Sequence, residues 1–280
     1  MTVTGVRRAF AGNGEHQVHY RHAGCEQGGV PLLALHGCPG SARQLVPLLT
    51  SLASTTRVIA PDLPGLGDSE PLTVAEPGIS DFAAAMLDFC DEQRLASFDL
   101  YGTHTGAAVA CELALLAPDR VGRIIVDGVA CFDAETAAEY RSYYAQPFAP
   151  DLDGAYLQRA FQFCRDQLIF FPWYDRRADS RRSGGLMPPE AFHAWLVEVL
   201  KAGTTYHHAY RAAFAWDWAD GLPRVTQPVL LTAAADDPLA SMTCDAANLF
   251  VDGRWAPLPA GSDVDFAAAR AALFRRHLAR

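Results

Sequence analysis

The chain has 280 residues, of which half are hydrophobic and one fifth are charged, so it can bury the core of one large α/β domain with an insertion. A net charge of −9, without a basic stripe, argues against nucleic-acid binding. The N-terminus lacks the apolar core of a signal peptide and no 18 apolar residues run together, so we expect a cytoplasmic protein with no membrane contact.

Cysteine usage points to a reducing environment. The seven cysteines form an odd set with no Cys-x-x-Cys spacing. This favours reduced, mostly buried thiols over disulfides or a zinc site. The cysteines stand at positions 25, 38, 90, 111, 131, 164 and 244.

The first patterned segment, residues 16–22, reads His-Gln-Val-His-Tyr-Arg-His and predicts an early antiparallel strand. His16, His19 and His22 would then share one face. Three histidines could form a metal site, but an exposed edge strand without a nearby carboxylate favours solvated side chains, and we expect no metal.

Strands and helices then alternate as far as residue 127. Buried strands are predicted at 31–35, 56–60, from 98 towards a turn ending at 106, and at 123–127. Helices are predicted at 42–53, at 80–94 with Ser80 as the cap, and from that turn to 116. This order implies a mainly parallel sheet covered by helices on both faces.

Residues 132–218 break the pattern, because strands disappear and 19 of the 29 aromatic residues of the chain fall there. Helical spacing at 157–171, 189–201 and 205–214 predicts an insertion of about four helices. An insertion between the sixth and seventh strands can lie across the carboxyl edge of the sheet, where ligands bind. The aromatics suit a roof over an apolar or aromatic substrate, or simply the core of the insertion.

Polar residues in and near the insertion supply candidates for substrate binding. Arginines 176, 177, 181 and 182 lie beside aromatics and could bind an acidic group or belong to a solvated loop. One of the two adjacent histidines at 207 and 208 is expected to face the interior of the insertion. The substrate-binding candidates are His36, Trp173, Arg176, Tyr206, His207 and Tyr210.

Beyond the insertion the sheet is predicted to resume. A strand at 228–233 leads through the turn 234–238 into a helix at 239–250. A final strand at 254–258 and a turn at 259–263 precede the last helix.

Three glycine-rich turns follow predicted strands. Residues 36–41, His-Gly-Cys-Pro-Gly-Ser, can aim the N–H of Cys38 into the space above the sheet, and residues 61–69 form a long turn rich in proline and glycine. Residues 102–106, Gly-Thr-His-Thr-Gly, have the pattern of a nucleophile elbow, a sharp turn from strand to helix that lifts His104 out of the fold. Glycine is expected at 102 and 106 because strand and helix nearly touch there.

Together these turns resemble motifs of the α/β-hydrolase superfamily, in its capped branch. The resemblance covers nearly the whole chain: residues 36–40 look like the oxyanion loop, 62–69 like the signature turn and 102–106 like the elbow. It implies a mainly parallel, eight-stranded α/β-hydrolase sheet built from 1–131 and 219–280, with a helical cap at 132–218. It also implies an oxyanion hole formed by the backbone N–H groups of Cys38 and Thr105, and an acid at Asp237.

Two positions depart from the family pattern. His104 stands where the family usually has serine, cysteine or aspartate, and Ser262 follows Gly261 where the catalytic histidine usually lies. A Ser-His-Asp relay therefore cannot be assembled from the usual positions. An imidazole reaches farther than a serine hydroxyl, so we predict that His104 hydrogen-bonds Asp237 and acts as a general base, with Ser262 as a third catalytic candidate.

Three functional hypotheses follow. The first is a hydrolase of a small apolar or aromatic ester, lactone, amide or carbon-carbon bond, with His104 activating water. The second is a cofactor-free lyase, isomerase or oxygenase in which His104 takes a proton from the substrate. The third is a non-catalytic protein that binds a small ligand. All three imply a small-molecule partner and no cofactor, and they leave a homodimer open.

Overall fold

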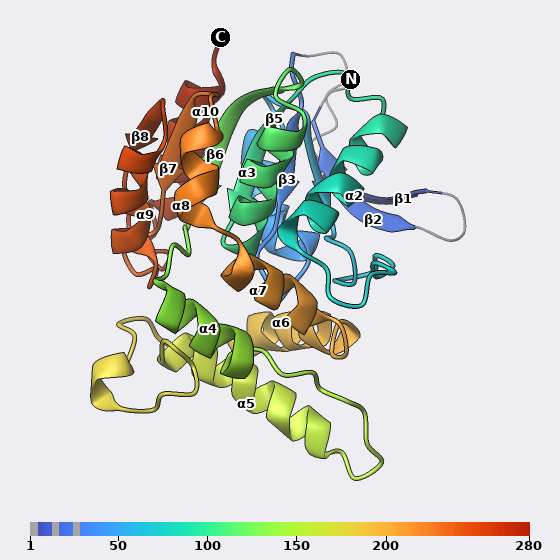
Figure 1. The fold of residues 1–280 in the computed structure, drawn as a ribbon, viewed down its shortest axis with the longest axis vertical. Coiled ribbons are helices and arrows are strands. Elements are labelled where there is room, and N and C mark those ends of the chain that lie inside the picture. The colour runs from blue at the N-terminus through green and yellow to red at the C-terminus, as the bar shows by residue number, and fades with distance from the viewer. Residues whose placement is uncertain (1–4, 13–16, 25–28) are drawn as a thin grey trace.

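The computed structural model describes residues 5–12, 17–24 and 29–280, and these form an eight-stranded, mainly parallel sheet (Figure 1). The strand order is β1-β2-β4-β3-β5-β6-β7-β8. The pairs β1·β2 and β2·β4 are antiparallel and all the others are parallel. The strands are β1 (Arg7–Ala11), β2 (Val18–Ala23), β3 (Leu32–Leu35), β4 (Val58–Pro61), β5 (Phe98–Thr103), β6 (Val121–Asp127), β7 (Val229–Thr232) and β8 (Gly253–Trp255).

Helices cover both faces of this sheet, as a strand that is apolar on both sides requires. Along β3, Leu33 packs in a core that includes α2 (Ile79–Glu92) and α3 (Thr105–Leu116), which lie in front of the sheet in Figure 1. Its neighbour Leu32 packs in a second core with α1 (Val46–Leu52) and α10 (Phe266–Leu278). The predicted α/β fold class is confirmed.

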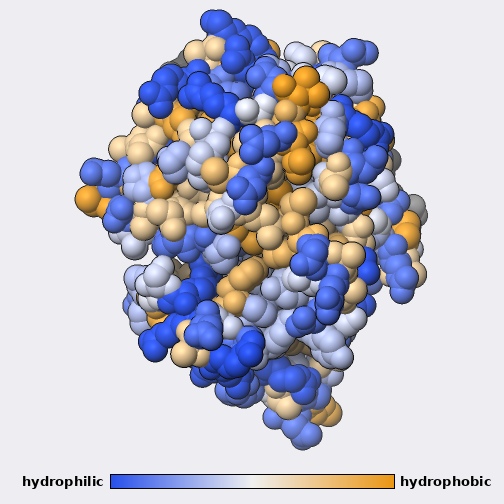
Figure 2. Space-filling view, turned by 60° about the vertical axis from the view of Figure 1, so that its left-hand side comes forward, coloured by the Kyte–Doolittle hydropathy of each residue, from blue (hydrophilic) through white to orange (hydrophobic). Residues whose placement is uncertain are grey.

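The segment between β6 and β7 is mainly helical, and its helices within residues 134–215 lie at the lower end of Figure 1, beyond the sheet. Its aromatic rings pack on one another: Tyr144 lies 5.4 Å from Phe214 and 5.2 Å from Tyr210, between ring centroids. Apolar residues also show along the middle of the molecule in Figure 2, where the upper part meets these helices. The helices are α4 (Ala134–Tyr143), α5 (Ala155–Ile169), α6 (Pro189–Lys201) and α7 (Tyr206–Ala215).

Several predicted boundaries differ from the structure for local reasons. Helix α2 is capped by Gly78 rather than Ser80, because the Asp81 carboxylate accepts the Gly78 N–H at 2.8 Å. The predicted helix 42–53 is a 3-10 turn, Ala42–Leu45, followed by α1, in whose first turn Pro47 stands. The remaining short helices are 3-10 at Ala178–Ser180, Leu222–Arg224 and Ala247–Leu249, and α-helical in α8 (Trp218–Gly221) and α9 (Ala240–Ala246).

The prediction of solvated histidines on an edge strand is wrong for His19. Strand β2 lies between β1 and β4, so it is not an edge, and His19 is buried. A carboxylate is also close, because His19 Nδ1 lies 2.8 Å from Asp62 Oδ2. His16 lies outside the described residues.

Two further properties concern the described part of the chain. The six cysteines in it are free thiols and four of them are buried, whereas Cys25 lies outside it. None of its helices has the length and apolar character needed to cross a membrane.

Candidate functional site

A sharp turn joins β5 to α3 and carries His104. His104 has φ 50° and ψ −113°, a backbone conformation that costs a non-glycine residue about 1–3 kcal/mol. A Cβ on Gly102 would lie 2.2 Å from the Gly106 carbonyl oxygen, and one on Gly106 would lie 2.3 Å from that of Leu35. Both positions therefore need glycine, and the turn holds His104 at the carboxyl end of β5.

The His104 side chain is paired with a carboxylate from the turn after β7. His104 Nε2 lies 2.7 Å from Asp237 Oδ2, and the Leu239 N–H donates to Asp237 Oδ1 at 2.8 Å. The His104 side chain keeps 39% of its surface exposed, against 16% for Asp237. The pair is thus fixed on its carboxylate side and open on its imidazole side.

The imidazole reaches Asp237 only because residue 128 has no side chain. Gly128 follows β6 and has φ +85°, and a Cβ there would lie 2.2 Å from His104 Cδ2 and 2.7 Å from Nε2. A side chain at this position would occupy the place of the ring. The sequence did not reveal that Gly128 leaves room for this ring, because a glycine after a strand looks like an ordinary turn.

Electrostatics define the protonation of the pair. Burial disfavours the imidazolium, but the charge of Asp237 and its hydrogen bond outweigh this, so the pKa of His104 is raised above its ordinary value. Burial likewise opposes the carboxylate of Asp237, but the charge and hydrogen bond of His104 lower the pKa of Asp237. An ionised carboxylate only accepts hydrogen bonds, so the Nε2 atom of His104 carries the shared hydrogen. In neutral His104 the basic lone pair is therefore on Nδ1.

A second acid, Asp127, lies near this pair at the end of β6. The Tyr101 hydroxyl donates to Asp127 Oδ2 at 2.8 Å, and the His104 N–H donates to the Asp127 carbonyl oxygen at 3.0 Å. Burial raises the pKa of Asp127, and its charge contributes to the raised pKa of His104. No motif surrounds this carboxyl, so the sequence did not reveal Asp127.

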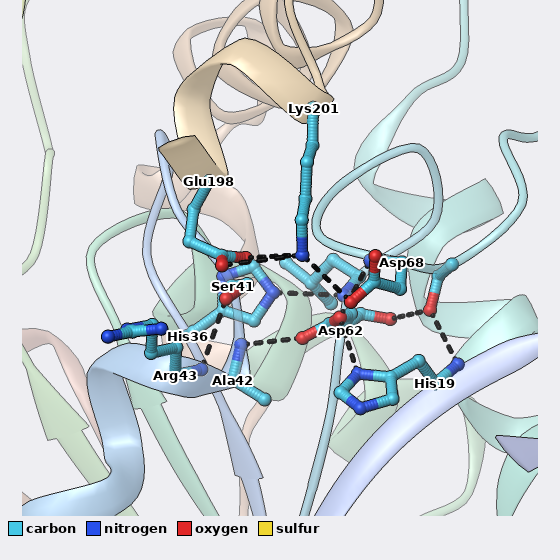
Figure 3. Close-up of polar contacts among 11 residues, drawn as sticks. His19, His36, Ser41, Ala42, Arg43, Asp62, Asp68, Glu198 and Lys201 are labelled. Atoms are coloured by element: carbon cyan, nitrogen blue, oxygen red, sulfur yellow. Dashed lines mark hydrogen bonds and ion pairs between the residues drawn. The ribbon is translucent and has the colours of Figure 1, made fainter. Parts of the chain in front are cut away.

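A buried polar network fixes the loop that contains Cys38 (Figure 3). Asp62 Oδ1 accepts the N–H of Ala42 at 2.7 Å and Asp62 Oδ2 accepts that of Asp68 at 2.9 Å. Burial opposes the Asp62 charge, but the hydrogen bond of His19 and these N–H groups lower the pKa of Asp62. The network joins the loop 36–41 to the turn 61–69.

The atoms of His19, Asp62 and Asp68 that could bind a metal lie within 4.8 Å of one another. Both carboxylate oxygens of Asp62 already accept backbone hydrogen bonds, and Asp68 Oδ2 is paired with Lys201 Nζ at 2.9 Å. The cluster therefore works as a brace, and the ion pair to Lys201 ties α6 to the turn, as Figure 3 shows. Helix α6 also holds the loop through Trp195, whose indole N–H donates to the Pro39 carbonyl oxygen at 2.9 Å.

A cavity of about 280 Å³ opens between the His104 turn, the Cys38 loop and the helices of the 132–218 segment. The residues around it are mainly apolar or aromatic, as is usual for a small-molecule site. Those that bear on the argument are Cys38, His104, Thr105, Phe132, Tyr144, Gln167, Phe171, Arg182, Met187, Trp195, Tyr210, Phe214 and Leu239.

The model of the α/β-hydrolase fold family matches residues 30–247. The chain belongs to the α/β-hydrolase family. Over 233 residues it is 28% identical to (E)-2-((N-methylformamido)methylene)succinate hydrolase of Acinetobacter baylyi, covering 80% of each chain. It is 25% identical over 230 residues to a putative carbamate hydrolase of Yersinia enterocolitica, covering 80% of this chain and 77% of the other.

Solved structures of other proteins share the fold of this α/β-hydrolase. The enol-lactonase of Burkholderia xenovorans LB400 superimposes with a TM-score of 0.71 at 19% identity, over 97% of this chain and 100% of the other. A hydrolase of Pseudomonas aeruginosa PA01 gives a TM-score of 0.73 at 23% identity, over 98% and 99% of the two chains.

The structure of this α/β-hydrolase brings some of the candidate residues together. Cys38, Thr105 and Tyr210 line the cavity with His104, and the residue after Asp237, Pro238, lines it as well. Thr105 is the first residue of α3, where a backbone N–H has no partner within the helix.

Other candidates do not line this cavity. His36 is buried with both ring nitrogens on backbone groups: Nδ1 donates to the Gly37 carbonyl oxygen at 2.9 Å and Nε2 accepts the Leu63 N–H at 3.0 Å. Burial lowers the pKa of His36, so it stays neutral inside the fold. Ser262 is exposed and lies outside the cavity lining; the preceding Gly261 N–H is bound by Asp236 Oδ1 at 2.7 Å.

Four candidates in the insertion serve its own structure and do not line the cavity. The Trp173 indole N–H donates to the Tyr144 carbonyl oxygen at 2.8 Å. The hydroxyl of the buried Tyr206 donates to the Gln146 carbonyl oxygen at 2.7 Å. Arg176 pairs with the buried Asp166 at 2.7 Å. His207 is buried beside His208, and burial lowers its pKa to about 4. Helical periodicity predicts which face of a helix is buried, but it does not predict which neighbouring element covers that face.

Proposed function

We propose that this protein hydrolyses a small apolar or aromatic ester, lactone, amide or carbon-carbon bond, with His104 as the general base. The observation that carries the proposal is the 2.7 Å contact between His104 Nε2 and Asp237 Oδ2 on the wall of the cavity. The relatives named as hydrolases support hydrolysis as the type of reaction. The strained turn of His104 takes the place of the family's nucleophile elbow.

In the proposed reaction, Nδ1 of neutral His104 accepts a proton from a water molecule, while Asp237 stabilises the imidazolium that forms. The oxygen of that water bonds to the substrate carbonyl carbon, and the carbonyl oxygen takes the negative charge. Backbone N–H groups of Cys38 and Thr105 stabilise this oxyanion. When the bond to the leaving group breaks, His104 returns the proton to it. General base catalysis of this kind contributes about 10²–10⁴-fold.

The arrangement reverses the orientation of imidazole in a Ser-His-Asp relay. There the carboxylate holds Nδ1 and the base is Nε2. Here the carboxylate is on Nε2, so the base is the nitrogen nearer to the main chain of His104 and hence to the N–H of Thr105. A water molecule between Nδ1 of His104 and the N–H of Thr105 would therefore be activated next to the proposed oxyanion hole.

We further propose that residues 132–218 act as a cap on a core made of 1–131 and 219–280. Residues of α5 and α7 line the same cavity as His104, and α6 contacts the Cys38 loop through Trp195. A cap in this position excludes water from the reacting bond and leaves one or a few waters for the base.

The test is incubation of the wild type and of His104→Ala with p-nitrophenyl esters and small lactones, which report hydrolysis, and with enolisable aromatic acids, which report proton removal. We expect His104→Ala to lose at least about 10²-fold in kcat/KM on any substrate that the wild type hydrolyses. Wild-type rates in His104→Ala would exclude His104 as the base. Release of an altered but unhydrolysed product would assign the pair to proton removal from the substrate instead.

A further inference from the structure

Arg182 is the one arginine or lysine among the described residues that line the cavity, and no aspartate or glutamate lines it with Arg182. A guanidinium remains charged at all physiological pH values, so its charge in this site needs a partner. Within the described part of the chain Arg182 forms no ion pair, since none of the salt bridges found there includes it.

Neighbouring arginines show that this is a property of Arg182 rather than of its loop. Arg176 is neutralised by Asp166 at 2.7 Å and Arg177 by Asp175 at 2.6 Å. Arg181 is exposed and does not line the cavity. Of the four arginines in this stretch, Arg182 alone faces the site and lacks a carboxylate within the described residues.

The backbone around Arg182 holds it firmly against the end of α5. Its N–H donates to the Ile169 carbonyl oxygen at 2.8 Å, and the N–H of Phe171 donates to that of Ser180 at 2.8 Å. The guanidinium donates one hydrogen bond, from Nη1 to the Gln167 carbonyl oxygen at 2.7 Å. A side chain held in this way loses little freedom when it binds a ligand.

Two hydrogen-bond donors without a partner in the described part of the chain lie on the cavity residues Arg182 and Gln167. Arg182 Nε and Gln167 Nε2 are buried and have no partner among the described residues. Buried donors without partners are costly, so a group that accepts from them is expected in the working site.

The charge of Arg182 also acts on the catalytic pair. It opposes the imidazolium of His104 and favours the carboxylate of Asp237, which places the guanidinium within electrostatic range of both. A bound anion at Arg182 would therefore lie within the same cavity as the reacting bond.

We propose that the substrate carries a carboxylate, which Arg182 binds while the bond to be hydrolysed lies at His104; this rests on the function proposed above. Guanidinium and carboxylate match as a pair of parallel hydrogen bonds and balance one charge with one. A phosphate would bring a charge of about −1.5 to −2 against a single cation, so a carboxylate fits better. The aromatic wall then favours an aryl or alkyl acid as the substrate class.

The test measures binding without turnover, in His104→Ala, so that neither catalysis nor the imidazolium contributes. Calorimetric titrations use aryl carboxylates graded from benzoate to 4-phenylbutyrate, each beside its neutral amide. At least one carboxylate should bind about 10- to 100-fold more tightly than its amide, and Arg182→Gln should remove that advantage while leaving amide affinity within about 2-fold. Arg181→Gln, one residue away and outside the cavity, should change neither. Arg182→Lys keeps the charge but not the paired N–H donors of a guanidinium, so its affinity for the carboxylate should lie between those of the parent and Arg182→Gln.

Three outcomes would each overturn the proposal. The first is equal affinity for acids and their amides, and the second is no saturable binding of any carboxylate in the series. The third is an unchanged preference for the acid in an Arg182→Gln variant whose Tm equals that of His104→Ala. The outcome is separable from that of the proposed function. Tight binding of carboxylates, without hydrolysis by the wild type of any ester or lactone that also carries a free carboxylate, would refute the hydrolase alone. Hydrolysis of neutral esters that depends on His104, without carboxylate binding, would refute the inference alone.

Discussion

Replacing Gly128 with alanine is expected to inactivate the protein although both residues of the His104–Asp237 pair are kept. The added Cβ would lie 2.2 Å from His104 Cδ2, whereas ordinary contacts begin at 3.4 Å, so the ring must move by about 1.2 Å. A displacement of that size is enough to break the 2.7 Å contact between Nε2 and Asp237. The imidazole then loses the carboxylate that sets its tautomer and stabilises its cation.

The expected loss in kcat/KM is about 10²–10⁴-fold, the range for removing a positioned general base or its carboxylate. Alanine at a positive φ also costs about 1–2 kcal/mol of backbone energy, so a fall of a few degrees in Tm should accompany the loss. Steady-state kinetics on an ester hydrolysed by the wild type, with a thermal melt of each variant, measures both effects.

The matched control is Gly154→Ala. Gly154 has a similar φ of +74°, but a Cβ there would meet nothing within 4 Å, so this variant carries the backbone strain without the clash. It should show a comparable fall in Tm and wild-type kinetics. In a double-mutant cycle, Asp237→Asn should cost much less in Gly128→Ala than in the wild type, because the pair is already broken. Wild-type kcat/KM in Gly128→Ala would refute the steric argument.

Four further predictions concern the pair and its surroundings. Activity should rise with pH as His104 loses its proton, with a midpoint above the ordinary histidine pKa of about 6.5, because Asp237 raises the pKa of His104. Asp237→Asn removes that charge, so the acid limb of the pH–rate profile should move to lower pH while the maximal rate falls; an unmoved limb would contradict the pairing. His104→Ser restores a hydroxyl at the turn without a base beside it, so its kcat/KM should stay near that of His104→Ala, and near-wild-type activity would contradict our account. Organophosphonates should leave the intact mass unchanged, since Ser262 is exposed and outside the cavity, whereas a stoichiometric adduct on Ser262 would show a serine nucleophile.

The sheet could be predicted from sequence because its information is local. Apolar runs such as β3 and β7 are buried at every position, and glycine at 102 and 106 is required by contacts of backbone with backbone. The order of strands and helices, together with three turns, was sufficient to recognise the α/β-hydrolase fold.

The insertion could be predicted only as a set of helices. Trp173 and Tyr206 were expected to face a ligand, but their polar atoms bind backbone carbonyls of the insertion. Tyr144 and Gln167 face the cavity instead. An amphipathic pattern fixes the buried face of a helix, whereas the partner of that face depends on loop geometry that the sequence does not show.

The residues around His104 illustrate a second limit. The motifs of their turns were enough to predict His104 and Asp237 from the sequence. Gly128 could not be predicted, because it matters through the space that its missing side chain leaves for the His104 ring. Similarly, the sequence predicted that His19 belongs to an exposed row of histidines. In the structure β1 pairs with its strand, and Asp62 contacts it from another turn. Such contacts between distant segments arise from packing and have no local signature.

The most direct test of the central claim compares two values for one ionisation. Nitrogen-15 NMR of the wild type, with the His104 signal assigned by its loss in His104→Ala, gives the tautomer and pKa of that ring. The pH dependence of kcat/KM gives the pKa of the group that must be unprotonated. We predict that the two pKa values coincide, above about 6.5, and that neutral His104 carries its hydrogen on Nε2. A hydrogen on Nδ1, or a kinetic pKa that differs from that of His104, would contradict the account.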